Sequence, residues 1–159
     1  MPVKPREMAK MTPSSLNWFL LFKLPSAWIS GVRVTGINGH SATAKVRHRW
    51  INQNPFRSMF WAVQGMAAEL STGALLMSAI KEQHRPVSML LLESHGSFSK
   101  KARGKITFSC DAGSQIREAL KKALDSGEGQ VCKIRSVGRD SQEEVVSNFE
   151  FVWTIKPKS

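Results

Sequence analysis

One stretch of the chain decides the fold: residues 54–82, NPFRSMFWAVQGMAAELSTGALLMSAIKE. Ser58 is a suitable helix N-cap, and the apolar run that follows is too long for a strand, so we predict a helix. Apolar side chains cover nearly its whole circumference: Met59, Phe60, Val63, Met66, Leu70, Leu75, Leu76, Met77 and Ile80. A helix of this kind is expected to be buried on every side.

One carboxylate, Glu69, lies in the middle of this helix, beside a stripe of small residues at helical spacing. The stripe consists of Ala62, Gly65, Thr72 and Gly73. Because a glycine inside a helix costs on the order of 1 kcal/mol relative to alanine, close approach by a backbone or a ligand should offset that cost. A carboxylate in apolar surroundings tends to have a raised pKa, which suits a base working near neutral pH. The alternative is a structural buried acid, held by hydrogen bonds to a neighbouring subunit.

Composition limits the class of protein and its partners. The 159 residues suit one domain, and 42% hydrophobic content is enough for a core. The chain has 23 Lys and Arg against 12 Asp and Glu, a formal charge of +11. This balance favours nucleic acid, an anionic membrane surface or a phosphate-bearing molecule such as coenzyme A, the alternative being a basic surface that only maintains solubility.

Several features favour a cytoplasmic location. Cys110 and Cys132 show no CxxC spacing, so we expect buried free thiols in a reducing compartment. The basic start is not followed by a cleavage site of the signal-peptide kind. We expect no transmembrane segment, because Glu69 lies near the centre of the only long apolar run and a central acidic residue costs about 2.5–3.5 kcal/mol. The four histidines lack the spacing of metal ligands, so we expect no metal site.

The chain before the long helix predicts one short helix and two strands. Thr12-Pro13 begins a strongly apolar helix that Pro25 stops. We expect this helix to pack on the sheet, the alternatives being a cap on a ligand tunnel or a part of a subunit interface. Asn38-Gly39 marks a hairpin between the next two strands. The second strand alternates, and its inner face should hold Ala42, Ala44, Val46, His48 and Trp50, with His48 a satisfied core residue.

The chain after the long helix predicts more strands around one surface helix. Residues 87–92 are continuously apolar, as in a strand buried on both faces, and Gly96 is a candidate bulge. Residues 113–129 change to helical period, and two strands end the chain. The sequence therefore predicts one α+β domain, in which the tail and short helix of residues 1–30 belong with the body, residues 31–159.

This order of elements resembles the hotdog fold over about residues 31–156. More narrowly, the chain resembles an uncharacterised branch of the hotdog thioesterase-like proteins (domain of unknown function 4442) that carries an extra helix between late strands. The segments that carry the resemblance are Asn54-Pro55, FWAVQGMAAE, the Phe-x-Lys-Lys-Ala-x-Gly run at 98–104 and the ending VVSNFEFVWTIK. It implies an antiparallel sheet wrapped around one long buried helix, with an extra N-terminal helix and a second surface helix.

The resemblance also implies roles for particular residues. In related thioesterases a central-helix Asp or Glu is the nucleophile or general base, and Glu69 occupies that place. Many relatives have an Asn or Gln about fifteen residues earlier that positions the water or the carboxylate, and Asn54 matches it. Relatives often begin the helix with His-Gly-Gly, where this chain has Phe60, Trp61 and Ala62. Helix N–H groups can still form an oxyanion hole, but Trp61 would obstruct the approach that glycine allows.

The residues expected to bind substrate lie along the helix groove and beyond the third strand. They are Trp61, Ala62, Gly65, Thr72, His95, Lys100, Lys101 and Arg103. Thr72 could bond the Glu69 carboxylate or a water. Lys100, Lys101 and Arg103 would bind the phosphates of coenzyme A as point charges. The alternative is that these three residues only form a solvated charged loop.

Three functions from different classes follow. The first is an acyl-CoA or acyl-carrier-protein thioesterase using Glu69 and Asn54, with coenzyme A entering only as part of the substrate. The second is a non-catalytic acyl-binding hotdog protein, in which Trp61 and the Met-rich helix shape a lipid pocket. The third is a basic nucleic-acid binder, which should interleave aromatics with Lys and Arg on one strand face. Because hotdog domains usually pair and an open sheet edge calls for a partner, we expect a homodimer, with a dimer of dimers left open.

Overall fold

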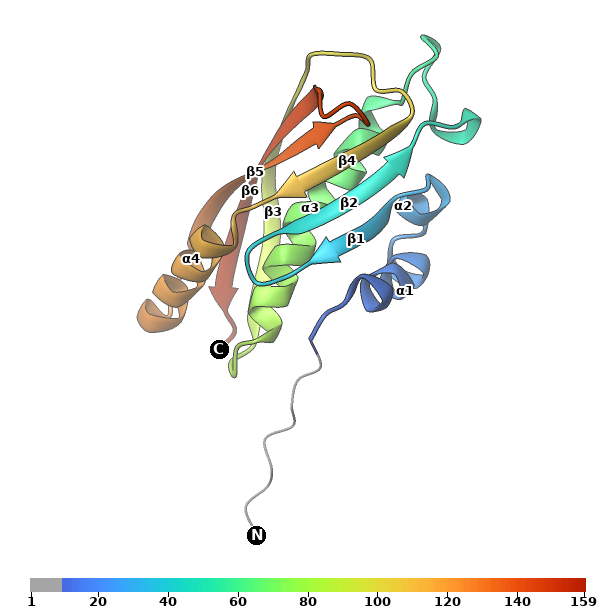
Figure 1. Ribbon diagram of the computed structural model, residues 1–159. Helices are drawn as coiled ribbons and strands as arrows, with labels where there is room; N and C mark the ends of the chain where they lie inside the picture. Colours follow the sequence, from blue (N-terminus) through green and yellow to red (C-terminus); the bar gives the residue numbers. More distant parts are fainter. Residues whose placement is uncertain (1–9) are drawn as a thin grey trace.

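The computed structural model describes residues 10–159, so most of the predicted basic tail lies outside the described residues. One antiparallel sheet in the order β1-β2-β4-β5-β6-β3 curves around a long central helix (Figure 1). The helical elements are α1 (Pro13–Lys23), α2 (Pro25–Ile29), the 3-10 turn η1 (Trp50–Asn52), α3 (Trp61–Lys81) and α4 (Gly113–Ser126). The strands are β1 (Arg33–Ile37), β2 (Ala42–Arg47), β3 (Val87–Phe98), β4 (Lys105–Cys110), β5 (Gln130–Arg139) and β6 (Val145–Pro157).

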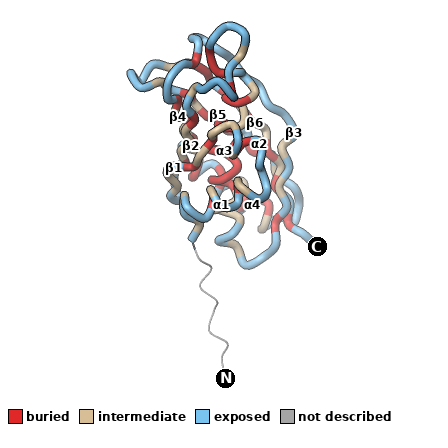
Figure 2. Tube along the Cα trace, turned by 90° about the vertical axis from the view of Figure 1, so that its right-hand side faces the viewer, coloured by how far each residue is buried: buried red, intermediate tan, exposed pale blue. Residues whose placement is uncertain are grey.

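The core lies between α3 and the concave face of the sheet. Buried positions follow the middle of α3 and the strands that face it, while much of the connecting loops is exposed (Figure 2). The largest side chains that are almost fully buried include Phe108, Ile106, Ile134, Ile155 and Leu76. This arrangement confirms the predicted α+β hotdog fold, with α1 as the extra N-terminal helix and α4 as the second surface helix.

Polar side chains also tie α3 to the sheet at defined points along its length. Three buried hydrogen bonds do this: Ser147 Oγ to Gln64 Oε1 at 2.9 Å, Ser71 Oγ with Ser136 Oγ at 2.7 Å, and Trp153 Nε1 to Thr72 Oγ1 at 3.1 Å. Because a buried polar group without a partner is expensive, these pairs disfavour any other rotation or sliding of the helix.

The helix begins later, and is less enclosed, than its apolar pattern predicts. It starts at Trp61 with Phe60 as a cap that makes no side-chain hydrogen bond, so the predicted Ser58 cap is wrong. The Ser58 hydroxyl instead bonds the side chain of Asn54. The helix is also not buried on every side, because Trp61 is 60% exposed and Glu69 is half-buried.

The outer edge of β1 is covered by α1. Thr12 caps this helix as expected, and Leu16 and Leu20 join the core. The Asn17 amide pairs with the backbone of Val34, donating to its carbonyl and accepting from its N–H, both at 2.9 Å. The amide thus takes the place of a neighbouring strand at this edge.

The inner face of the second strand is shorter than predicted. β2 ends at Arg47, and Trp50 lies in the η1 turn with 82% of its surface exposed, so its predicted inward position is wrong. His48 Nε2 is buried without a hydrogen-bond partner among the described residues, which differs from the satisfied core histidine expected there.

The opposite edge of the sheet, β3, is open. Leu90 is 60% exposed and Leu92 is 50% exposed, so in one chain this strand is not buried on both faces as its apolar run predicts. The bulge lies between Leu91 and Glu93 and not at Gly96. Since a bulge adds one residue to the strand, the side chains beyond it reverse which face they occupy.

Candidate active site

A cavity of about 530 Å³ lies between α3 and the β3 edge of the sheet. Its lining residues are Trp61, Ala62, Gly65, Met66 and Glu69 of α3, Leu91, Ser94, Gly96 and Phe98 of β3, and Phe149 and Phe151 of β6. Glu69 is the only ionisable side chain among them. The cavity is therefore an apolar chamber with one carboxylate in its wall.

The Glu69 carboxylate has the environment of a base with a raised pKa. Burial raises the pKa of Glu69 because removal of water disfavours the ionised form. Among residues 10–159, no hydrogen bond or ion pair reaches this carboxylate to counteract that effect. Oε1 lies 3.6 Å from the position that a Cβ on Gly73 would take, so the group rests against its own helix.

Small residues make room for the aromatic wall of the cavity. A Cβ on Gly96 would lie 2.8 Å from Cε1 of Phe149, and one on Gly65 would lie 3.6 Å from the same atom. The Phe149 ring also meets Phe98 edge-on, with ring centroids 5.6 Å apart. The sequence identified Gly65, but not Gly96, Phe98 or Phe149 as site residues. For Phe149 a signal was available, because its strand alternates and places it on the inner face.

A second cavity, of about 500 Å³, adjoins the first past Trp61 and Phe98, which line both. Asn54, Lys100 and Lys101 lie in its wall. The two cavities together form an elongated site with Glu69 in one half and cationic side chains in the other.

The structure does not bring Asn54 to Glu69 of the same chain. The Asn54 Oδ1 accepts hydrogen bonds from the N–H groups of Phe56 at 2.9 Å and Ser58 at 3.2 Å, and its Nδ2 donates to Ser58 Oγ at 3.0 Å. These contacts hold the loop before α3. Asn54 lines only the second cavity.

Thr72 and His95 also lie apart from the Glu69 carboxylate. Thr72 is buried outside both cavities, and its hydroxyl donates to the backbone carbonyl of Glu69 at 2.9 Å. His95 is exposed, with Nε2 3.4 Å from Glu93 Oε2, and does not line the Glu69 cavity. The bulge before it explains this position, because Ser94 rather than His95 then faces the helix.

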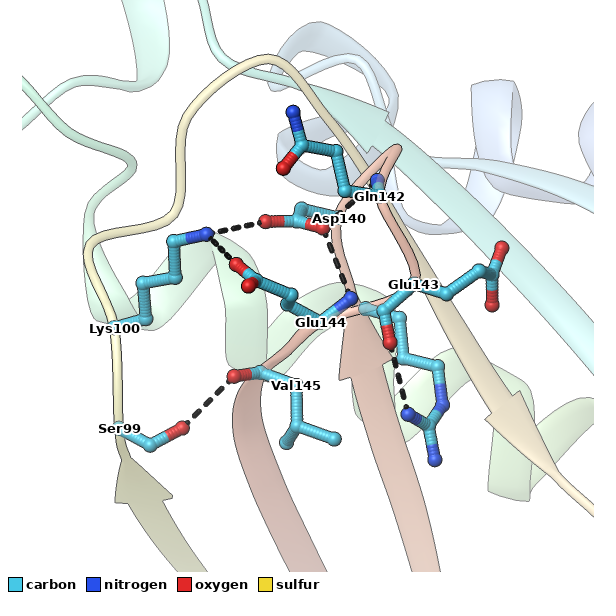
Figure 3. Close-up of polar contacts among 8 residues, drawn as sticks. Ser99, Lys100, Asp140, Gln142, Glu143, Glu144 and Val145 are labelled. Carbon is cyan, nitrogen blue, oxygen red and sulfur yellow. Dashed lines mark hydrogen bonds and ion pairs between the residues drawn. The ribbon is translucent and has the colours of Figure 1, made fainter.

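The three predicted phosphate-binding cations differ in how far they are engaged. Lys100 Nζ bonds Asp140 Oδ2 at 2.9 Å and also Glu144, which fastens the loop after β3 to the β5–β6 turn (Figure 3). The hydrogen bond from Lys100 lowers the pKa of Asp140. Arg103 uses its Nε on the carbonyl of Arg57, whereas Lys101 has no ion pair among the described residues. Lys101 is thus the least committed charge at the second cavity.

The first turn of α3 presents backbone donors at the same site. The N–H groups of Trp61 and Ala62 have no acceptor within residues 10–159, as expected for the start of a helix. Eight residues separate Trp61 from Glu69, which is about 12 Å along the helix axis. One carbonyl group cannot contact both ends of that separation in a single chain.

Comparison with known proteins identifies the family. A model described as a domain of unknown function, DUF4442, matches residues 13–155. The chain belongs to the DUF4442 family. No curated protein sequence matches this DUF4442 chain at a significant level.

Solved structures share the fold of this DUF4442 protein at low sequence identity. A Pseudomonas aeruginosa protein of unknown function, described as a "probable thioesterase", has TM-score 0.80 at 21% identity and covers 94% of this chain and 100% of its own. A Chlorobaculum tepidum protein of unknown function gives 0.78 at 13% identity, covering 94% and 99%. A Haemophilus influenzae thioesterase gives 0.66 at 9%, covering 94% of each chain. At these identities the likeness establishes the hotdog fold.

Other reactive groups in the described part of the DUF4442 chain offer less. Cys110 and Cys132 are free and buried, and burial raises the pKa of Cys110 to about 11, so its thiol is protonated at neutral pH. Within residues 10–159, no three His, Cys, Asp or Glu side chains are grouped to hold a metal ion. No helix in that range is long and apolar enough to cross a membrane. Glu69 is therefore the strongest candidate for a catalytic group in the described part of the chain.

Proposed function

We propose that this protein hydrolyses acyl thioesters of coenzyme A or acyl carrier protein, with Glu69 as the general base or nucleophile. The observation that carries the proposal is the unpaired Glu69 carboxylate in the wall of an apolar cavity of about 530 Å³. The cavity is suited to an acyl chain, because apolar walls bind methylene groups and exclude water. Among the structural neighbours, the Haemophilus influenzae protein is named a thioesterase, which supports the reaction class.

Two routes are open to Glu69, and both convert a thioester and water into a carboxylic acid and a thiol. As a base, the carboxylate removes a proton from water while the water oxygen attacks the thioester carbon, and the C–S bond then breaks. As a nucleophile, it attacks the carbon itself and expels the thiolate, leaving a mixed anhydride that water cleaves. In either route the developing oxyanion needs donors, and the free N–H groups at the start of α3 are suitable.

The separation of about 12 Å between Glu69 and its own helix start favours an active site shared by two chains. The open edge of β3 provides a place for a second copy, because strand pairing there would satisfy its free backbone groups. A two-fold axis at this edge would set Glu69 of one protomer against the helix start and Asn54 loop of its partner. The homodimer is therefore part of the proposal. Exposed Val131 on the outer face of the sheet could support a dimer of dimers.

The second cavity would receive the phosphate-bearing part of the substrate. We assign this role to Lys101, which lines the cavity, because Lys100 is already paired with two carboxylates and Arg103 does not line it. Lys101→Ala should raise KM for acyl-CoA several-fold with little change in kcat. It should not affect an acyl-N-acetylcysteamine, which has no phosphates. Lys81→Ala, at the other end of α3, is the matched control; an equal effect on both thioesters would contradict the assignment.

Trp61 favours a second candidate function, acyl binding without hydrolysis. Its side chain lies between the two cavities, at a position where related hotdog thioesterases often have glycine, and it could keep water or the thioester from the reacting position.

We also propose a cytoplasmic location, which the two free thiols support.

A panel of short, long and aromatic acyl-CoA thioesters would test the proposal, with the free thiol as readout. Wild-type protein should release thiol, and Glu69→Gln should lower kcat at least on the order of 100-fold. Glu93→Gln, which removes an exposed carboxylate of β3, is the matched control and should retain activity. If no member of the panel is hydrolysed but acyl-CoA still binds, the acyl-binding function replaces the proposed one. Full activity of Glu69→Gln would contradict the role of Glu69.

A further inference from the structure

The N-terminal helix α1 has an apolar outer face in addition to the face that joins the core. Leu16 and Leu20 point inward and are buried. On the outside, Trp18 is 61% exposed and Phe22 is 71% exposed, and their rings stack with centroids 5.9 Å apart. A helix that is apolar on all faces is normally covered on all faces. We therefore expect another molecule to cover the outer face of α1.

The exposed apolar surface continues beyond α1 onto its neighbours. Leu24, between α1 and α2, and Ile29, at the end of α2, are exposed, and α1 and α2 lie together on one side of the molecule (Figures 1 and 2). The η1 turn is joined to the end of α2, because Asn52 Nδ2 donates to the Ser30 carbonyl at 2.9 Å. We use the term α1–η1 face for the exposed apolar side chains of this surface: Trp18, Phe19, Phe22, Leu24, Ile29 and Trp50.

The segment of the chain that carries this face has an excess of positive charge and no acidic residue. The sequence contains no Asp or Glu between Glu7 and Glu69, but it contains seven Lys and Arg in that interval. Every ion pair of the described residues lies between residues 93 and 150, in the other half of the chain. Arg33 Cζ lies over the Trp28 ring, 3.4 Å from its centroid, and burial, together with the charge of Arg49, lowers the pKa of Arg33.

We propose that the α1–η1 face docks this protein on an anionic phospholipid bilayer. Exposed Trp, Phe and aliphatic side chains bordered by Lys and Arg are the composition of surfaces that lie in the membrane interface. Cations near such a surface are attracted by the negative potential of anionic headgroups. The proposal is independent of the reaction at Glu69.

Two other occupants fit the same surface less well. A second copy paired symmetrically through this face would set like charges against one another, because no acidic residue of this segment can compensate them. A nucleic acid would use exposed rings for base stacking, but Trp18 is already stacked on Phe22, and Leu24 and Ile29 offer no ring. A bilayer uses both the aliphatic and the aromatic side chains.

Co-sedimentation of the full chain with lipid vesicles tests this inference. The wild-type protein should bind vesicles of phosphatidylcholine with roughly one-third phosphatidylglycerol, bind pure phosphatidylcholine much less, and dissociate as salt screens the headgroup charge. The double variant Trp18→Ser/Phe22→Ser should lose on the order of tenfold in affinity. Val131→Ser, at an equally exposed apolar position on β5, should bind as the wild type does.

A second variant keeps the test decisive if the double variant fails to fold. Lys23→Gln, an exposed charge in the last turn of α1, should weaken binding to the anionic vesicles, whereas Lys121→Gln on α4 should not. Absence of wild-type binding, or equal binding by all four variants, would overturn the proposal. So would a lower oligomeric mass for the Trp18→Ser/Phe22→Ser variant in light scattering, or tight binding of DNA that the same variant abolishes, because either would assign the face to another occupant.

Discussion

Glu69 illustrates how one residue combines a stability cost with a chemical use. The chain buries this carboxylate without a hydrogen-bond partner among the described residues, which destabilises its ionised form. A base of raised pKa accepts a proton from water more readily than an exposed carboxylate does. The same burial that weakens the fold at neutral pH would therefore strengthen Glu69 in its proposed role as a base.

The effect of Glu69 on stability should depend on pH in a defined direction. Its pKa is raised in the folded state, so the folded protein holds this proton more tightly than the unfolded chain does. Stability from this group is complete below the unfolded pKa of 4.5 and is lost as pH rises through the folded pKa. Glu69→Gln should therefore melt at a higher temperature than wild type at pH 7, and the difference should disappear near pH 4. Calorimetry at both pH values checks this; a constant difference would contradict it.

Gly138 should be intolerant of a side chain. A Cβ there would lie 2.5 Å from Cε1 of Phe108, a ring with no exposed surface. Gly138→Ala should destabilise the fold by about 1–3 kcal/mol, because the packed ring cannot move away. Gly129→Ala, where the nearest atom is at 3.7 Å, is the matched control and should stay close to wild type in urea denaturation. Equal midpoints for the two variants would contradict the packing argument.

At the scale of elements, one edge of the sheet is covered by a helix and the other is open. The β1 edge is covered by α1 through the Asn17 amide, whereas the β3 edge carries no cover within residues 10–159. Natural sheets normally protect their edges from pairing with other chains. Protection of only one edge is consistent with the proposed pairing of β3 with a partner strand.

Asn17 should be required for the covered edge. Asn17→Leu removes both bonds to Val34 and leaves its backbone groups without partners, so the variant should lose about 1–3 kcal/mol of stability. Hydrogen exchange at the Val34 amide should accelerate more than at strands of the sheet centre. Asn148→Leu, an exposed asparagine of β6, is the control. Unchanged exchange at Val34 would show that α1 does not protect this edge.

Elements with a clear hydrophobic period were predictable from the sequence, whereas the burial of the edge strand and the position of its bulge were not. The alternation in β2 and the apolar run of α3 identified both elements, because burial repeats with the geometry of strand and helix. The apolar run of β3 predicted a strand buried on both faces, but Leu90 and Leu92 are exposed in the single chain. A bulge leaves no local signal in β3, so the side of the sheet that His95 occupies could not be read from the pattern.

The candidate site was predictable in part. Glu69 stood out because it is a single charge in an apolar helix, and Gly65 because glycine is unfavourable there. Asn54 has the residue type and spacing of a catalytic amide, yet its side chain is used in the loop before α3. Lys100 likewise has partners, Asp140 and Glu144, forty residues or more along the chain, which no local pattern reveals.

At the scale of the whole molecule, the open β3 edge and the separation along α3 both support the proposed pair of chains. Light scattering at micromolar concentration should give twice the chain mass of 17.7 kDa, or four times if dimers pair again. Leu90→Arg places a charge on the exposed part of β3 and should shift the mass toward that of a monomer. Leu24→Arg, on the opposite side of the molecule, should not. A monomeric wild-type protein would contradict the shared site.

The central claim is that Glu69 of one chain works with the helix start of another, and mixing subunits tests it most directly. Glu69→Gln removes the base, and Ala62→Pro removes one N–H donor at a helix position that tolerates proline, with Ala62→Gly as the control for packing. Each variant alone should be inactive toward an acyl-CoA that the wild type hydrolyses. Unfolded and refolded together in equal amounts, the two variants should recover about a quarter of wild-type activity. Half of the dimers are then mixed, and each mixed dimer has one intact site of two, built from Glu69 of one chain and the unaltered helix start of the other. No recovery in a mixture that demonstrably forms mixed dimers would place the whole site within one chain and contradict the account.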